Sequence, residues 1–412
     1  MNKQKKMILV PSYLRSFSCI GSACEDTCCT GWRVDIDKAT YLKYKKVKDS
    51  EMKQLFGDHV KRNRSNPSDR MYAKINVHEH SGCPMLTENS LCKVQLQLGE
   101  EFLSNVCTSY PRVSNIVNDV VERSATMSCP EAARLALLNP NKMEFDEIEE
   151  TLNNKFATQG YLNSSTSKNR LTPYFWDMRI FTIRLLQNRT YTVSDRLILL
   201  GIFIQNADDL VRIKKENEIP LLIENYEKLI STGAFNDSLK EVPVEWTPQV
   251  KLLKKLIDTR VTLGIRNQRY LDCHEAMTTG IGFTDENSIE EVTLRYQMVY
   301  KNHYEPFMEK HCYILENYLV NHVYKNLFPL GSGIDCMEDY VKLVVQFGLI
   351  KMHLVGLAGY YKDSFNLEHV VTCIQSIAKT IEHNESFLRY ALELLKATEF
   401  NSLAGMAIFI KN

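Results

Sequence analysis

The chain has 412 residues, of which 44% are hydrophobic and 24% charged, so it is long enough for two or three globular domains with sizeable cores. Fifty lysine and arginine residues balance fifty aspartate and glutamate residues, which argues against a protein that binds nucleic acid or an anionic membrane through its overall charge. We therefore expect neither a nucleic-acid partner nor a membrane partner.

Two apolar stretches bear on where the protein works. The basic start is followed only by Met7–Val10 before Pro11, which is too short for the apolar segment of a secretory signal. The longest apolar stretch, Val341–Tyr361, is interrupted by polar residues such as Lys342 and His353, which predicts a buried helix and not a membrane span. Both observations favour a cytoplasmic protein.

Residues 1–150 are predicted to be rich in loops, with few periodic segments. The expected elements are a helix over Thr40–Leu55, a loop over Asn63–Asp69, a short strand over Lys74–Val77, a helix over Gln95–Val106 with Cys92 and Cys107 at its ends, and a helix over Glu131–Leu138 after Pro130. The polar stretch 151–170 is predicted to be a linker.

Residues 171–412 are predicted to be entirely helical. The pattern indicates a helix over Pro173–Asn188 with Thr172 as its N-cap, one capped by Ser194, one from Pro248 to Gly264, one after a capping box at Ser288 and Glu291, one from Pro306 towards Pro329, and helices over about 336–358, 366–383 and 385–397. The predicted fold is thus mostly α, a loop-rich, cysteine-dense metal-binding domain followed by an all-helical domain.

The cysteines are distributed unevenly. Four of the twelve are scattered through the second half, as expected of small buried side chains. The other eight gather in the first 130 residues, beside Gly, Pro, Asp and Thr in turn-like sequence: Cys19, Cys24, Cys28, Cys29, Cys83, Cys92, Cys107 and Cys129.

Three interpretations of these eight cysteines are open. Disulfides require an oxidising compartment, which nothing in the sequence indicates. Buried, reduced thiols are a second possibility. Metal ligation is favoured, because clustered thiolates select zinc or iron–sulfur centres. The spacing lacks the Cys-x2-Cys pair of zinc fingers and the three-cysteine motif of radical enzymes. His78 and His80 are either further ligands or solvated loop residues.

Several segments resemble the bacterial flagellin lysine-N-methylases, part of a wider group of cysteine-rich proteins described as zinc- or iron-chelating. The similarity is carried by the cysteine motifs and continues in the helical part, through Phe17–Tyr44 (FSCIGSACEDTCCTGWRVDIDKATYLKY), Cys83–Leu86 (CPML), Leu91–Arg112, Met127–Leu135 (MSCPEAARL), Thr172–Arg189, Leu315–Pro329 and Ile374–His383. It therefore spans nearly the whole chain.

The resemblance implies an enzyme that methylates lysine ε-amino groups of flagellin with S-adenosylmethionine as the methyl donor. It also implies an iron–sulfur cluster, of the 4Fe-4S type, held by some of the eight cysteines, with zinc as the alternative. The competing hypothesis is a non-enzymatic metal-binding or redox-sensing protein-interaction module, because no methyl-donor motif is visible in the sequence.

A methylase must deprotonate its substrate, since a lysine amine near neutral pH is almost entirely protonated. One predicted helix carries candidate groups for this step: Glu316, Asn317, Tyr318, Asn321 and His322. We select Glu316 as the candidate base; the alternative is a solvated face or an interhelical hydrogen-bond network. Similarly, the aromatic run Tyr174–Trp176 is suited either to stacking on an adenine or lysine or to packing in the core.

Overall fold

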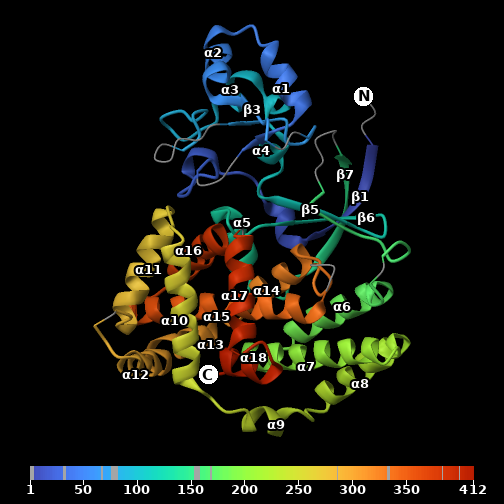
Figure 1. Ribbon diagram of the computed structural model, residues 1–412, viewed down its shortest axis with the longest axis vertical. Coiled ribbons are helices and arrows are strands. Elements are labelled where there is room, and N and C mark those ends of the chain that lie inside the picture. The colour runs from blue at the N-terminus through green and yellow to red at the C-terminus, as the bar shows by residue number, and fades with distance from the viewer. Residues whose placement is uncertain are drawn as a thin grey trace.

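The structure is a computed structural model that describes residues 4–30, 34–65, 68–75, 82–152, 158–167, 169–284, 286–331, 335–382, 384–398 and 400–412. A small lobe with most of the cysteines stands above a five-stranded sheet, and helices fill the rest of the molecule (Figure 1). The predicted mostly α fold is confirmed. The first 150 residues, however, are a mixed α/β region with two sheets, where the sequence predicted loops and one short strand.

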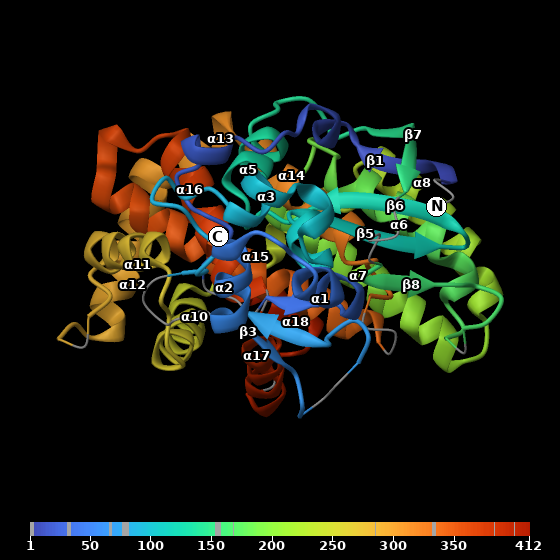
Figure 2. The same ribbon diagram turned by 90° about the horizontal axis from the view of Figure 1, so that it is seen from above.

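The larger sheet has the strand order β7-β1-β6-β5-β8, and Figure 2 shows these strands side by side. β1 pairs with β7 in antiparallel and with β6 in parallel orientation. A two-residue turn joins β5 to β6 through Asn118 and Asp119, whose φ angles of 46° and 70° suit such residues. The strands are β1 (Gln4–Pro11), β5 (Arg112–Val117), β6 (Val120–Ala125), β7 (Phe145–Leu152) and β8 (Gly160–Leu162).

The last strand, β8, falls within the stretch 151–170 that the sequence predicted as a linker. It pairs in parallel with β5 and so completes the sheet. Its Gly160 N–H donates to the side-chain oxygen of Asn115 at 2.9 Å, which is a further bond between this stretch and β5. The junction between the two parts of the chain is therefore partly structured.

The cysteine lobe contains a three-stranded sheet and four short helices around its own apolar core. Tyr44 stacks on Phe56 in this core, with ring centroids 3.8 Å apart. The elements are β2 (Asp35–Ile36), α1 (Lys38–Lys45), α2 (Ser50–His59), β3 (Val60–Arg62), β4 (Ala73–Ile75), α3 (Lys93–Leu98) and α4 (Asn105–Ser109), with 3-10 turns η2 (Gly21–Ala23) and η3 (Glu100–Phe102). The 3-10 turn η1 (Ser12–Ser16) follows β1 and packs its Tyr13 in the main core instead.

Two helices predicted in this lobe are interrupted. Asp49 accepts a hydrogen bond from the Met52 N–H and so starts α2, which divides the predicted helix Thr40–Leu55 in two. Gly99, at φ 88°, ends α3 and divides the predicted helix Gln95–Val106. The predicted strand Lys74–Val77 corresponds to β4, as far as its residues are described.

The predicted helix after Pro130 is present as α5 (Pro130–Leu137), ahead of β7 and β8. The helical part begins at Thr172. It comprises η4 (Thr172–Tyr174), α6 (Phe175–Leu186), α7 (Val193–Arg212), η5 (Glu216–Glu218), α8 (Ile219–Ser231), α9 (Asn236–Glu241), α10 (Trp246–Thr262), α11 (Gln268–Ile281), α12 (Ile289–Val299), α13 (Glu305–Lys310), α14 (Tyr313–Lys325), α15 (Cys336–Tyr361), η7 (Lys362–Ser364), α16 (Leu367–Ile377), α17 (Glu385–Ala397) and α18 (Leu403–Ile410), with π-helical turns η6 (Tyr300–Tyr304) and η8 (Ala378–Glu382).

The predicted caps are only partly correct. The capping box at Ser288 is confirmed, with both of its hydrogen bonds present. Thr192, and not Ser194, caps α7, since its side chain accepts from the Asp195 N–H. Thr172 lies in the 3-10 turn that precedes α6 and makes no cap with its side chain.

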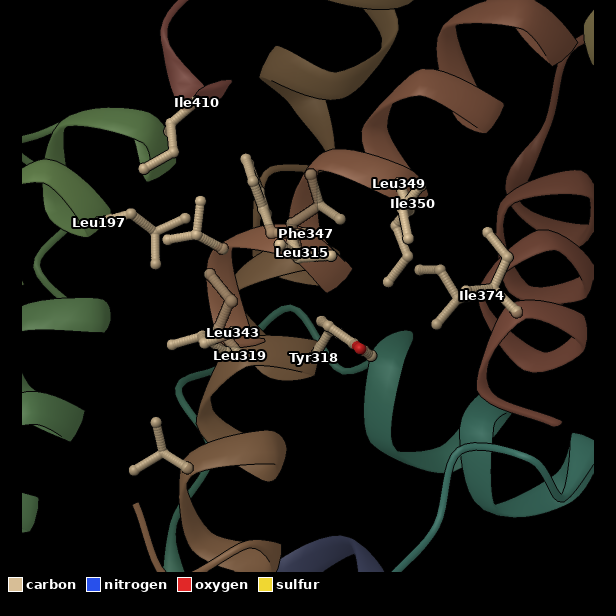
Figure 3. Close-up of a cluster of buried hydrophobic side chains, with 14 of the residues drawn as sticks. Leu197, Leu315, Tyr318, Leu319, Leu343, Phe347, Leu349, Ile350, Ile374 and Ile410 are labelled. Atoms are coloured by element: carbon tan, nitrogen blue, oxygen red, sulfur yellow. The ribbon is translucent and has the colours of Figure 1, made fainter. Parts of the chain in front are cut away.

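The centre of the helical part is α15, around which the other helices pack (Figure 1). Side chains from α14, α15 and α16 interlock there, among them Leu319, Phe347 and Ile374 (Figure 3). Of the described helices, Cys336–Ser364 has the length and apolarity to cross a membrane, but 94% of its apolar window is buried inside the protein. The predicted buried helix over Val341–Tyr361 is thus confirmed.

Candidate metal centre and buried polar network

Four cysteines from separate segments line the core of the cysteine lobe. Cys83 is buried there, and Cys29, Cys92 and Cys107 are partly buried against it. The backbone holds them in place: the Cys83 N–H donates to the Cys29 carbonyl at 2.9 Å, Cys92 precedes α3, and the Cys107 N–H donates to the Ser104 hydroxyl at 3.2 Å. The fold therefore gathers thiols that are far apart in sequence.

These thiols lie close enough to influence one another's ionisation. Burial raises the pKa of Cys107 to about 11, the Ser104 hydrogen bond opposes this, and negative charge on Cys92, Cys83 and Cys28 raises it further. Burial likewise raises the pKa of Cys83, with further increases from charge on Cys92 and Cys28. Several thiolates in this core are unfavourable unless a cation compensates their charge.

Cys28 and Cys29 form the junction between this core and a second group of cysteines. Their sulfur atoms lie 3.9 Å apart. The contact with Cys29 lowers the pKa of Cys28 to about 7, burial opposes the change, and the nearby Lys379 ammonium also lowers it. The same contact, followed by burial, raises the pKa of Cys29. Cys28 is thus the more acidic thiol of the pair, and Cys29 is the one with the raised pKa.

The second group contains Cys24 and Cys129, which lie on the side of Cys28 towards α5. Cys129 immediately precedes α5; burial raises its pKa to about 11, the N–H groups of that helix oppose the change, and charge on Cys24 and Cys28 adds to it. Cys19 is exposed on the segment before η2 and belongs to neither group. Of the eight cysteines selected from the sequence, the structure therefore brings seven into two adjoining groups.

The donor set matches a soft metal, because thiols predominate and the site lies at the edge of an apolar core. Across the described residues, however, no three Cys, His, Asp or Glu side chains are arranged to hold a metal ion as they stand. Ligation therefore requires the thiol side chains to turn towards a common centre. The candidate ligands His78 and His80 lie outside the described residues.

The candidate base Glu316 lies on α14, which has every residue from Ile314 to Lys325 buried. Both of its carboxylate oxygens are occupied: Arg189 donates to them at 2.9–3.2 Å and Arg196 at 2.9 Å. Burial lowers the pKa of the Arg196 guanidinium, and the charge of Glu316 opposes that change. Glu316 thus neutralises two arginines, one of them buried.

The asparagines of α14 face the larger sheet and the segment that follows α5. Asn321 accepts from the Tyr13 hydroxyl at 2.7 Å and donates to the Ala125 carbonyl at 3.1 Å, while Asn317 donates to the Asn139 carbonyl at 2.8 Å. These contacts form a buried hydrogen-bond network, but its partners lie in the sheet and in the chain after α5, whereas the alternative to a pocket was a network between helices. They join the helical part to the sheet.

The aromatic residues at the start of α6 are placed mainly as core residues. Phe175 is fully buried and Trp176 packs on the core. The Arg179 guanidinium lies 4.7 Å from the Phe175 ring and 4.4 Å from the Trp176 ring, and it pairs with buried Glu122 of β6. Within the described residues, the rings of Phe175 and Trp176 therefore pack against Arg179 of the same chain.

A second buried polar cluster joins the candidate residues Tyr318 and His322 to Lys325 and Glu382, which the sequence does not single out. Glu382, in η8, accepts from the Tyr318 hydroxyl at 2.8 Å and from the Lys325 ammonium at 2.9 Å. His322 lies between them on α14, and burial lowers its pKa to about 4. The i, i+4, i+7 spacing of Tyr318, His322 and Lys325 was the available signal, because it places three polar side chains on one face of a buried helix.

A hollow of about 430 Å³ lies on the surface of α10 and has the size of a small-ligand site. It is lined by Lys251, Lys254, Lys255, Asp258, Thr259, Thr262 and Leu263. Neither the candidate cysteines nor the polar residues of α14 line it.

Residues 179–409 match the model of the FliB lysine N-methylase C-terminal domain, which is more than half of the chain. The chain therefore belongs to the FliB lysine N-methylase family. It is 23% identical to the lysine-N-methylases of Salmonella typhimurium, over 388 residues, and Salmonella choleraesuis, over 394 residues, with 91% of each chain covered. It is also 36% identical to the flagellar biosynthetic protein FliU of Salmonella muenchen over 138 residues, 33% of this chain and 80% of that one.

No solved structure matches the chain. The family nevertheless decides between the two classes of protein that the sequence left open. The expected enzyme class, a lysine N-methylase, is confirmed, and it is favoured over a non-enzymatic interaction module.

Proposed function

We propose that this lysine N-methylase transfers methyl groups from S-adenosylmethionine to lysine ε-amino groups of flagellin. The support is the full-length similarity to two lysine-N-methylases together with the similarity to a flagellar biosynthetic protein. We place the reaction in the cytoplasm, where the cysteines of this chain would stay reduced.

The observation that carries the metal part of the proposal is the convergence of thiols from four chain segments. We propose that the cysteine lobe holds an iron–sulfur cluster of the 4Fe-4S type, with zinc as the alternative. The residues that would hold it are Cys83, Cys92 and Cys107 together with Cys28 or Cys29, because Cys29 shares one core with the first three and the Cys28 sulfur lies 3.9 Å from that of Cys29. A bound cluster would supply a structural centre for the lobe and a store for an electron.

The chain's own residues must then bind the lysine, exclude water and accept a proton. Removing the proton from the lysine ammonium is required before its nitrogen attacks a methyl group. Glu316 is poorly suited to accept it, because both oxygens are engaged by Arg189 and Arg196. Desolvation of the lysine in a protein pocket would favour the neutral amine, which is the form that reacts.

Anaerobic purification followed by iron, sulfide and zinc analysis tests the metal centre. We expect iron and sulfide in the wild type and their loss in a Cys83→Ser/Cys107→Ser variant. A Cys312→Ser variant is the matched control, since Cys312 is partly exposed in the helical part. Zinc without sulfide would refute the iron–sulfur cluster, and a wild-type protein without metal would refute the centre altogether.

Co-expression with flagellin tests the substrate. The intact mass of flagellin should rise by whole methyl units with the wild type and with Cys312→Ser. If the metal centre is needed for folding or activity, the double cysteine variant should leave that mass unchanged. An unmodified flagellin in the presence of folded, metal-loaded wild-type protein would refute the proposed substrate.

A further inference from the structure

The helical part binds the cysteine segment Cys24–Cys29 through an acidic side chain of that segment, Asp26. The Asp26 carboxylate accepts from the Lys379 ammonium at 2.7 Å and from the Gln375 amide at 2.8 Å. The Lys379 ammonium also donates to the Thr27 carbonyl at 3.0 Å. The side chains of Asp26 and Lys379 are only 10% and 12% exposed, so this ion pair is largely shielded from water. We call Asp26, Gln375 and Lys379 the clamp.

The clamp also reaches the second cysteine segment. The Gln375 amide donates to the Ser128 carbonyl at 2.8 Å, and Ser128 directly precedes Cys129. The Arg269 guanidinium of α11 donates to the side-chain oxygen Oε1 of Gln375 at 3.1 Å and so fixes which way the side-chain amide faces. One glutamine and one lysine from consecutive turns thus hold the backbone beside Cys28 and beside Cys129.

The position of Lys379 sets the clamp apart from an ordinary surface pair. Gln375 lies in the last turn of α16, and Lys379 lies in the π-helical turn η8 that continues this helix. The same turn carries Glu382, which accepts from Tyr318 and Lys325 of α14. A single irregular turn therefore contacts the cysteine segment on one side and the buried polar cluster of α14 on the other. Irregular turns of this kind frequently occur at functional sites.

We propose that Lys379 is a positioning residue that holds the cysteine segment Cys24–Cys29 against the methylase helices and places a positive charge beside the thiols that would hold the metal. Only the second part of this inference, the positive charge beside the metal-binding thiols, rests on the proposed metal centre. Because coupling between two sites is reciprocal, a metal that orders the cysteine segment also stabilises the turn η8, and the reverse holds as well.

Amide hydrogen exchange tests the clamp without reference to metal or activity. Lys379→Met keeps the length of the side chain and removes its charge, whereas Lys379→Arg keeps the charge. Lys342→Met is the matched control, because Lys342 belongs to a partly shielded ion pair of α15. We expect exchange across Cys24–Cys29 to be faster by about tenfold in Lys379→Met and near the wild-type rate in the other two. Unchanged exchange in Lys379→Met would overturn the clamp.

Metal retention tests the positioning role. Metal per chain is measured after a timed challenge with a chelator, and Lys379→Met should lose it about tenfold faster than the wild type, with Lys379→Arg restoring retention. Faster amide hydrogen exchange together with unchanged metal retention would overturn the positioning role, and Lys379 would then only stabilise the contact between the two segments. A wild-type protein that holds no metal would refute the proposed centre instead, and the exchange measurement would still decide the clamp.

Discussion

Replacing Glu316 by glutamine removes one negative charge from the interior while keeping the shape of the side chain. Glu316 is fully buried, and Arg196, whose side chain is 2% exposed, loses its ionic partner. Arg189 is 36% exposed and can turn to water. Breaking a buried ion pair by removing one partner costs about 3–5 kcal/mol, because the remaining charge is left uncompensated. That is a large share of the roughly 5–15 kcal/mol by which a folded protein is stable.

Urea unfolding followed by circular dichroism measures this loss. Glu338→Gln is the control, because Glu338 pairs with Lys342 at 27% exposure and should cost only about 0–1 kcal/mol. Methyl transfer is measured at a temperature where Glu316→Gln is still folded, and we expect it to persist there. A variant that unfolds like the wild type but no longer transfers methyl groups would refute this reasoning and make Glu316 the base.

Two further predictions concern stability. Gly280→Ala should destabilise the protein by at least about 3 kcal/mol, because a Cβ atom there would lie 1.9 Å from the Gly356 carbonyl oxygen of α15. Gly57→Ala should instead stabilise α2 by about 0.5–1 kcal/mol, because a Cβ atom at this position would meet nothing within 4 Å. Thermal unfolding measures both changes. His322 should make the protein less stable as the pH falls from 6.5 to about 4, by about 3 kcal/mol, because the unfolded chain binds a proton that the buried imidazole does not. His322→Gln should flatten that part of the stability–pH curve, and an unchanged slope would contradict the assignment.

The helical part was readable from the sequence because its signals are local. The capping box at Ser288 and the apolar stretch of α15 both predict the element that is present. The sheet was missed because its signals are not local. β7 reads FDEIEETL, whose acidic residues do not resemble a buried strand, and β8 is three residues long. Such strands are defined by their neighbours, β1 and β5, which lie far away in sequence.

The candidate site likewise has features that the sequence predicts and features that only the fold defines. Clustering of the cysteines in sequence was visible, but the two spatial groups were not, because Cys83 and Cys107 meet Cys29 only through the fold of the lobe. The clamp joins residues more than three hundred positions apart, so no sequence pattern indicates it. The sequence indicates Glu316 only through its position on a predicted helix, and its two arginine partners, which the fold supplies, show how its charge is used.

The most direct test of the central claim is the mass of flagellin after incubation with the purified, anaerobically isolated protein and S-adenosylmethionine. We expect mass increments of whole methyl units that peptide mapping assigns to lysine side chains, and no increments without the methyl donor. An unchanged flagellin mass with folded, metal-loaded enzyme, or methyl groups on residues other than lysine, would contradict the proposed activity.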